Sequence, residues 1–138
     1  MRVVLDSNIF IFAFREKKTV CMRILENMDL FEVFIPSLIL DEVVERLKML
    51  VNKNFASKVR HTILSSSIHV VEVSTTPKTL IKKYEKKNLK TSDAVIAAFA
   101  EYIKADYLLS ENRHFLKNLK TTKFRVKNAE QFLEMVGL

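Results

Sequence analysis

Short runs of β-prone apolar residues alternate along this chain with longer segments whose apolar residues recur at helical spacing. Five runs predict strands: Val3–Leu5, Phe31–Ile35, Ile68–Val73, Asp106–Leu109 and Lys123–Val126. The helical segments are Ile9–Phe14, Leu40–Val51, Phe55–Leu64, a lysine-rich segment with Thr76 as its N-cap and Pro77 at its first helical position, a segment opening at Thr91, and Asn128–Val136. Strands that alternate with helices are typical of parallel sheets covered on both faces. We therefore expect an α/β fold, a three-layer α/β/α sandwich around a mainly parallel sheet of four to five strands.

No feature of the sequence divides the chain. Its 138 residues are about one domain's worth, and it contains only two prolines, Pro36 and Pro77, and no low-complexity tract or repeat. We predict a single domain over residues 1–138.

The one glycine, Gly137, stands next to the last residue. A Walker A loop, a dinucleotide fingerprint and a nucleophile elbow all need internal glycines, so these sites are excluded.

The cysteine content and the charge distribution predict a compartment. Cys21 is the only cysteine, so no internal disulfide forms, and its apolar neighbours favour a small buried hydrophobe over a nucleophile. The longest stretch without a charged residue is the eleven residues His61–Val71, shorter than the roughly 18 that span a bilayer. Asp6 falls where a signal peptide would be apolar. We expect a cytoplasmic protein with no membrane span.

Polar side chains lie next to the predicted strands where a parallel sheet gathers its ligands. Asp6 follows the first strand, Glu42 lies early in the helix after the second, Asp93 opens the helix before the fourth, and Ser110, Glu111 and Asn112 follow the fourth. Ligands bind at the carboxyl ends of such strands, so we expect these groups to converge. Clustered carboxylates repel unless a cation neutralises them, and oxygen ligands favour Mg²⁺ or Mn²⁺. The sequence therefore predicts an acidic metal pocket.

Each acid also has an ordinary structural explanation. Asp6 and Asp93 stand where helices begin, and Asp is a favoured N-cap residue. An acid that ends an apolar strand nevertheless costs desolvation energy unless it finds a partner, which favours a ligand role for Asp6. Glu42 is preferred to its neighbour Asp41 because Val43 marks the buried arc beside it.

At these residues the sequence resembles the PIN-domain family of ribonucleases, which includes the VapC-type toxins of toxin-antitoxin pairs. The resemblance extends from near residue 1 to the end of the chain. The matching stretches are Val3–Asn8, Leu40–Glu42, Thr91–Ala94, Ala105–Phe115 and Val126–Leu133.

The resemblance implies a hydrolase that cleaves RNA phosphodiester bonds with Mg²⁺ or Mn²⁺. It assigns the catalytic, metal-binding acids to Asp6, Glu42 and Asp93, and the family's usual fourth acid falls on Asn112, which departs from the pattern. We expect Asn112 to bind the metal as well, through its neutral carbonyl oxygen. Asn8, Ser110 and Glu111 would lie next to these ligands and orient them without being the main metal-binding groups. We expect Glu111 to face solvent, because adjacent positions leaving a strand point to opposite sides. The resemblance also implies an antitoxin partner.

Positive charge gathers in two segments of this +7 chain. Lys78–Lys90 has a net charge of +5, and Arg113–Lys127 has a net charge of +6. Both flank the predicted acids in sequence, and a basic rim suits a nucleic-acid backbone. We predict RNA contacts from Arg113, Lys117, Lys120 and Lys123, with a solvated helix face as the alternative explanation for the lysines.

Asn112 suggests one alternative function, a degenerate PIN domain that binds RNA or protein without cutting. A second alternative, a receiver-like phosphorylation module, would need paired acids after the first strand and a phosphoacceptor Asp after the third. Asp6–Asn8 and Val73–Thr75 supply neither. The apolar segment Ile9–Phe14 fits a homodimer face, an antitoxin groove or buried core equally well.

Overall fold

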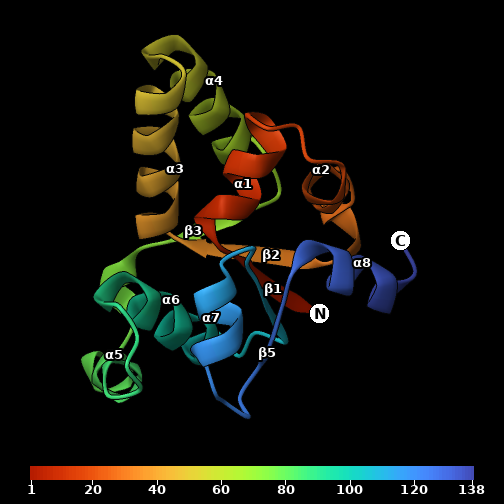
Figure 1. The fold of residues 1–138 in the computed structure, drawn as a ribbon. Helices are drawn as coiled ribbons and strands as arrows, with labels where there is room; N and C mark the ends of the chain where they lie inside the picture. Colours follow the sequence, from red (N-terminus) through yellow and green to blue (C-terminus); the bar gives the residue numbers. More distant parts are fainter.

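The computed structural model describes residues 1–138 and contains one five-stranded sheet (Figure 1). The strands are β1 (Arg2–Leu5), β2 (Glu32–Pro36), β3 (His69–Val71), β4 (Tyr107–Leu109) and β5 (Arg125–Lys127). They lie in the order β3-β2-β1-β4-β5, and every neighbouring pair is parallel. The predicted parallel sheet is confirmed. Its order differs from the 2-1-3-4-5 order of the flavodoxin-like fold, to which receiver modules belong.

Eight α-helices and two 3₁₀ turns connect the strands. They are α1 (Ser7–Phe14), α2 (Thr19–Glu26), η1 (Met28–Leu30), α3 (Ser37–Leu50), α4 (Lys53–Leu64), η2 (Val73–Thr75), α5 (Lys78–Glu85), α6 (Thr91–Tyr102), α7 (Arg113–Asn118) and α8 (Ala129–Val136). Helices α1 to α4 cover one face of the sheet and α5 to α7 the other, with α8 beside α2 (Figure 1). Parallel crossovers are right-handed, so the helices change face where the chain turns back at β3. The predicted three-layer sandwich is confirmed.

The core forms one cluster of 35 buried apolar residues on both sides of the sheet. Val3, Val4 and Leu5 of β1 are fully buried because β1 lies at the centre of the sheet under helices on both faces. Helix α6 buries Ala94 and every residue from Ile96 to Ala100, since it packs between the sheet and α5. Small alanines on α6 let these layers approach closely.

The structure differs from the sequence prediction mainly in short elements. Helices α2 and α7 were not predicted; α7 has only six residues, too few to establish a helical period. The predicted N-cap at Thr76 is wrong: α5 begins at Lys78 after Pro77, and the buried Thr76 hydroxyl has no hydrogen-bond partner. Strand β3 ends at Val71 rather than Val73, because the chain turns there into η2.

None of the helices combines the length and the apolar character needed to cross a bilayer.

Candidate metal centre

The carboxyl edge of the sheet brings together side chains from four elements. Asp6 follows β1 and Ser110 follows β4, and these two strands are paired with Leu5 opposite Leu109. Helix α3 starts where β2 ends and carries Glu42 in its second turn, while Asp93 lies in the first turn of α6. The topology thus places the predicted acids at one edge of the sheet.

Asp6 is the most enclosed acid of this group, with 6% of its surface exposed. Its Oδ1 accepts a hydrogen bond from the Ser7 N–H at 2.8 Å, so it caps α1. Its Oδ2 accepts a hydrogen bond from the Ser110 hydroxyl at 2.7 Å. Because the carboxylate has two oxygens, Asp6 caps α1 with one and contacts Ser110 in the candidate site with the other.

Burial raises the pKa of Asp6 to about 6, against the hydrogen bonds from Ser110 and Ser7, and the negative charges of Glu42 and Asp93 add to the rise. Both other acids are thus near enough to act on Asp6 electrostatically. A cation at this edge would relieve the repulsion among them.

Ser7 connects Asp6 to Glu42. Its backbone N–H donates to Asp6, and its hydroxyl donates to Glu42 Oε1 at 3.0 Å. Ser7 is 97% buried, with 3% of its surface exposed. Ser7 was not among the predicted site residues, because its partner Glu42 lies 35 positions away in sequence and no local pattern reveals the contact.

Asp93 is half-buried, and no side chain or backbone group of the protein hydrogen-bonds its carboxylate. Burial raises its pKa, Lys90 lowers it, and Glu42 raises it further. The capping explanation considered for Asp93 does not hold, since Lys90 is the N-cap residue of α6 and no side chain caps the helix. Its two oxygens are free for a ligand.

Asn8 and Ser110 fix the loop after β4. Asn8 Oδ1 accepts from the Glu111 N–H at 3.0 Å, and Asn8 Nδ2 donates to Ser110 Oγ at 3.3 Å. Ser110 Oγ also accepts from the Asn112 N–H at 3.0 Å. The Ser110 hydroxyl is therefore fully used and directed at Asp6.

The expectation that Glu111 faces solvent is wrong. Its side chain is only 9% exposed and pairs with Lys18 at 3.1 Å, with the Cys21 thiol donating at 3.6 Å. The bond from its N–H to Asn8 turns the side chain towards α2 instead of outwards. Cys21 is buried as expected, and burial beside Glu111 raises its pKa to about 12, which keeps the thiol protonated.

Asn112 caps α7, with its Oδ1 accepting from the His114 N–H at 3.0 Å. An amide oxygen has two lone pairs, so capping leaves one for another donor or a cation.

The four predicted RNA-binding residues do not share one place. Arg113 and Lys117 are exposed on α7, which begins next to the acids. Lys120 and Lys123 lie in the loop before β5, at the amino edge of the sheet, where Arg125 pairs with Tyr107 at the start of β4. A basic rim made of all four residues is therefore ruled out by the topology.

No three His, Cys, Asp or Glu side chains lie close enough to hold one ion between them in this arrangement of side chains. The donor chemistry still suits a hard cation, since Asp6, Glu42 and Asp93 supply only carboxylate oxygens. Mutually repelling carboxylates draw together when an ion neutralises them.

Comparisons with solved structures agree with this fold. VapBC2 from Rickettsia felis, bound to a DNA fragment from its promoter, has a TM-score of 0.69 at 20% identity, covering 93% of this chain and 98% of that chain. DNA-bound VapBC from Salmonella typhimurium has a TM-score of 0.70 at 16% identity, covering 94% and 98%. VapC20 from Mycobacterium tuberculosis, a toxin that cleaves the sarcin-ricin loop, has a TM-score of 0.66 at 12% identity, covering 82% and 92%. At these identities the likeness concerns the fold.

Among curated proteins, no relative matches the sequence. The family model of the PIN domain does match it, over residues 3–119. This range begins within β1, contains β2 to β4, and includes Asp6, Glu42, Asp93 and Glu111. The chain belongs to the PIN domain family.

Proposed function

We propose that this protein is a divalent-metal-dependent ribonuclease and the toxin of a toxin-antitoxin pair. The observation that carries the proposal is the buried Asp6, whose pKa is raised to about 6 beside Glu42 and Asp93 at the carboxyl edge of the sheet. A fold that needed only a helix cap at this position would gain nothing from three acids. A cluster of acids around a buried carboxylate suits a cation that meets a phosphate.

Mg²⁺ or Mn²⁺ would be held by Asp6, Glu42 and Asp93, with Asn112 adding a neutral oxygen. A bound divalent ion lowers the pKa of a coordinated water and offsets charge on the phosphate. The protein contributes orientation: Ser110 fixes the Asp6 carboxylate at 2.7 Å and Ser7 fixes Glu42 at 3.0 Å. No side chain is needed as a covalent nucleophile.

We propose RNA as the substrate because exposed, positively charged side chains lie beside the acids. Arg113 follows Asn112 directly, and Lys90 precedes the first turn of α6, which carries Asp93. Both can contact a phosphate held at the acidic cluster.

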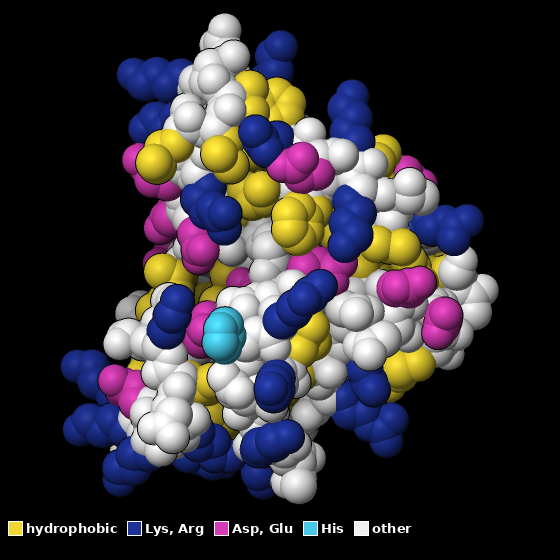
Figure 2. All heavy atoms as spheres, viewed as in Figure 1, with side chains coloured by type: hydrophobic (Ala, Val, Ile, Leu, Met, Phe, Trp, Pro, Cys, Tyr) yellow, Lys and Arg dark blue, Asp and Glu magenta, His cyan; other side chains and the backbone are white.

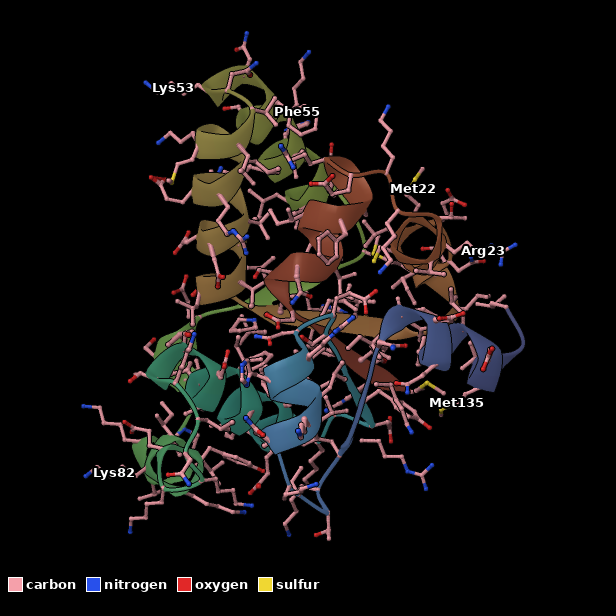
Figure 3. The ribbon with its side chains drawn as sticks, in the orientation of Figure 1. Met22, Arg23, Lys53, Phe55, Lys82 and Met135 are labelled. Atoms are coloured by element: carbon pink, nitrogen blue, oxygen red, sulfur yellow. The ribbon has the colours of Figure 1, made fainter.

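The antitoxin would dock in an apolar pocket on the helical face that α1 to α4 form. This pocket has a volume of about 280 Å³ and lies between α1, α2 and α4; Phe14, Met22, Leu25 and Ile63 are among its lining residues. Met22 lies on α2 close to α1 (Figure 3). Such a pocket accepts the apolar side chains of an amphipathic helix. The structures of VapBC complexes, which this chain resembles in fold, support a protein partner of this kind.

The proposed activity is tested with purified protein and a labelled single-stranded RNA. We expect cleavage with Mg²⁺ or Mn²⁺ and none with a chelator. Asp6→Asn and Glu42→Gln should each abolish measurable cleavage, because the loss of a charged ligand weakens the binding of the metal ion. Asp41→Asn is the matched control for Glu42→Gln, since Asp41 is exposed on the same helix. Cleavage that survives both ligand changes would refute the assignment.

The degenerate PIN domain predicts a different result. Asn112 occupies the fourth acidic position, and its carbonyl oxygen already caps α7. A chain that binds RNA equally well with and without metal, and never cleaves it, would favour this alternative.

A further inference from the structure

A basic groove lies at the amino edge of the sheet, away from the acids. It is an open cleft of about 510 Å³ between α5 and the loop that joins α7 to β5. We call it the amino-edge groove and define it by its lining residues, Lys83, Lys87, Leu119, Lys120, Thr121, Thr122 and Lys123. Four of the seven are lysines, two carry hydroxyls, and none is acidic.

The wall of the groove is held in place by buried contacts. Tyr84 is fully buried, and its hydroxyl donates to Glu101 at 2.7 Å and lies 3.2 Å from the Thr121 hydroxyl. Lys83 pairs with Glu101 at 2.8 Å, and Lys87 donates to the Lys120 carbonyl at 2.7 Å. These contacts join α5, α6 and the loop before β5. The lysines therefore stand on a fixed scaffold.

Three of the four lysines in the groove form no ion pair: only Lys83 does, and Lys87, Lys120 and Lys123 do not. Lys123 is nevertheless near enough to Glu101 to help lower the pKa of that carboxylate. Two further clefts continue from Lys123: one of about 610 Å³ reaches Asp106 and Arg125, and one of about 370 Å³ reaches Glu101, Lys104 and Asp106. Figure 2 shows Lys and Arg side chains gathered over α5, α7 and this loop.

The groove and the acids lie at opposite ends of α6. Asp93 is in the first turn of α6, and Glu101, which anchors the wall of the groove, comes eight residues later. Eight residues of α-helix span about 12 Å along the axis. The groove is therefore a separate surface and does not belong to the acidic cluster.

We propose that the amino-edge groove binds the phosphate backbone of RNA, so that the protein holds a long RNA at two places. This inference rests on the proposed ribonuclease function. Lysines and threonine hydroxyls are phosphate ligands that recognise no base. A protein partner is less well suited, because protein interfaces depend on buried apolar or aromatic anchors and Leu119 is the only apolar lining residue.

The test compares two double variants that remove the same charge. Lys120→Gln/Lys123→Gln changes two exposed, unpaired lysines of the groove. Lys53→Gln/Lys58→Gln is the control, because both lysines are exposed on α4 and form no ion pair. Lys53 lies at the far end of the molecule from Lys82 of α5 (Figure 3). Both variants keep the Tyr84 contacts intact.

Binding of an RNA of about 20 nucleotides is measured in a chelator, where no cleavage occurs. We expect the groove variant to lose about tenfold in affinity at low salt and its slope of log K against log salt to fall by about 1.4, or 0.7 for each phosphate contact. The control should match the unchanged protein, and the loss should be equal for unrelated RNA sequences. Equal slopes for the groove and control variants would overturn the proposal.

Cleavage then separates this proposal from the proposed function. We expect the groove variant to raise KM for the long RNA with kcat unchanged, and to cleave a dinucleotide substrate normally, because a dinucleotide cannot span both places. Loss of dinucleotide cleavage in the groove variant would contradict the proposal that the groove is separate from the site of cleavage. If no RNA is cleaved by any variant but the slopes still differ, the groove holds and the ribonuclease function fails. If the groove variant weakens binding of an acidic protein but not of RNA, the groove is a protein site and the proposal is wrong.

Discussion

At the scale of single residues, Asp6 shows how one carboxylate serves both the fold and the site. One oxygen caps α1 and the other accepts the Ser110 hydroxyl, yet burial still raises its pKa to about 6. The ordinary pKa of 3.8 applies when the chain is unfolded. The folded protein therefore holds the Asp6 proton more tightly than the unfolded chain.

This difference predicts a pH-dependent stability in the absence of metal. Between about pH 4 and pH 6 the folded state binds more protons, so the free energy of unfolding falls as pH rises. Asp6→Asn removes the charge and should increase the stability at pH 7 by about 1–3 kcal/mol in a chelator. Urea unfolding of the parent protein and of Asp6→Asn at pH 4, 5, 6 and 7, in a chelator, measures the free energy of unfolding. A variant less stable than the parent at pH 7 would show that the hydrogen bonds of the carboxylate outweigh its desolvation.

The loop after β4 supports a second prediction. Asn112→Asp adds a negative charge beside the acids while keeping an oxygen that can cap α7, so metal affinity should rise about tenfold and cleavage should persist. Glu111→Gln is the comparison, since its side chain faces Lys18 and Cys21 and not Asp6. We expect it to change metal affinity less than twofold, measured by calorimetry. A collapse of metal binding in Glu111→Gln would mean that Glu111 turns inwards as a ligand.

At the scale of elements, the contact between α5 and α6 depends on one polar cluster. Burial raises the pKa of Tyr84 to about 12, so its hydroxyl stays a neutral donor to Glu101. Burial acts to raise the pKa of Glu101, but the hydrogen bonds from Lys83 and Tyr84 outweigh it and lower the pKa. The carboxylate is therefore ionised where two helices meet.

Tyr84→Phe should destabilise the protein by about 1–2 kcal/mol, because it removes a buried hydrogen bond to a charged group while the ring still fills its space. Tyr102→Phe is the matched control, since Tyr102 is on the same pair of helices, 45% exposed and without a hydrogen bond. It should change stability by less than 0.5 kcal/mol. Chemical denaturation of both variants tests this; equal effects would mean that the Tyr84 hydroxyl contributes nothing.

At the scale of the whole molecule, the sheet topology separates the acids of the candidate site from the lysines of the amino-edge groove. Strands β1 and β4 and the starts of α3 and α6 bring acids to the carboxyl edge. Helix α5 and the loop before β5 bring lysines to the amino edge. A cation at the acids should therefore stabilise the entire fold, because its ligands come from four separated parts of the chain.

We expect Mg²⁺ or Mn²⁺ to raise Tm, following RT ln(1 + [L]/Kd), by about 2–6 °C at saturating metal. The triple change Asp6→Asn/Glu42→Gln/Asp93→Asn should abolish this rise and give a higher Tm than the parent without metal, as the repulsion is gone. Asp41→Asn should keep the full response. Thermal unfolding with and without metal decides it, and a metal response that survives the triple change would exclude these ligands.

The sequence by itself determined the layers and the acids. The spacing of apolar residues along a strand or helix is a local property of the sequence, so the alternation of strands and helices identified the parallel sheet. The apolar run Val3–Leu5 ends at Asp6, which placed Asp6 at the carboxyl edge. Helix α7 was not predicted because its six residues make less than two turns. The pairing of Ser7 with Glu42 needed the fold, since the two residues are far apart in sequence.

Only the tertiary structure decided the direction of Glu111 and the location of the basic residues. Alternation along a strand predicted that Glu111 points to solvent, but its bond to Asn8 and its ion pair with Lys18 turn it under α2. Lys120 and Lys123 are close to Asn112 in sequence, yet α7 carries the chain to the opposite edge of the sheet. The physical reasons differ: the direction of Glu111 depends on partners that distant parts of the chain supply, whereas the place of Lys120 and Lys123 depends on the path that the chain takes through α7.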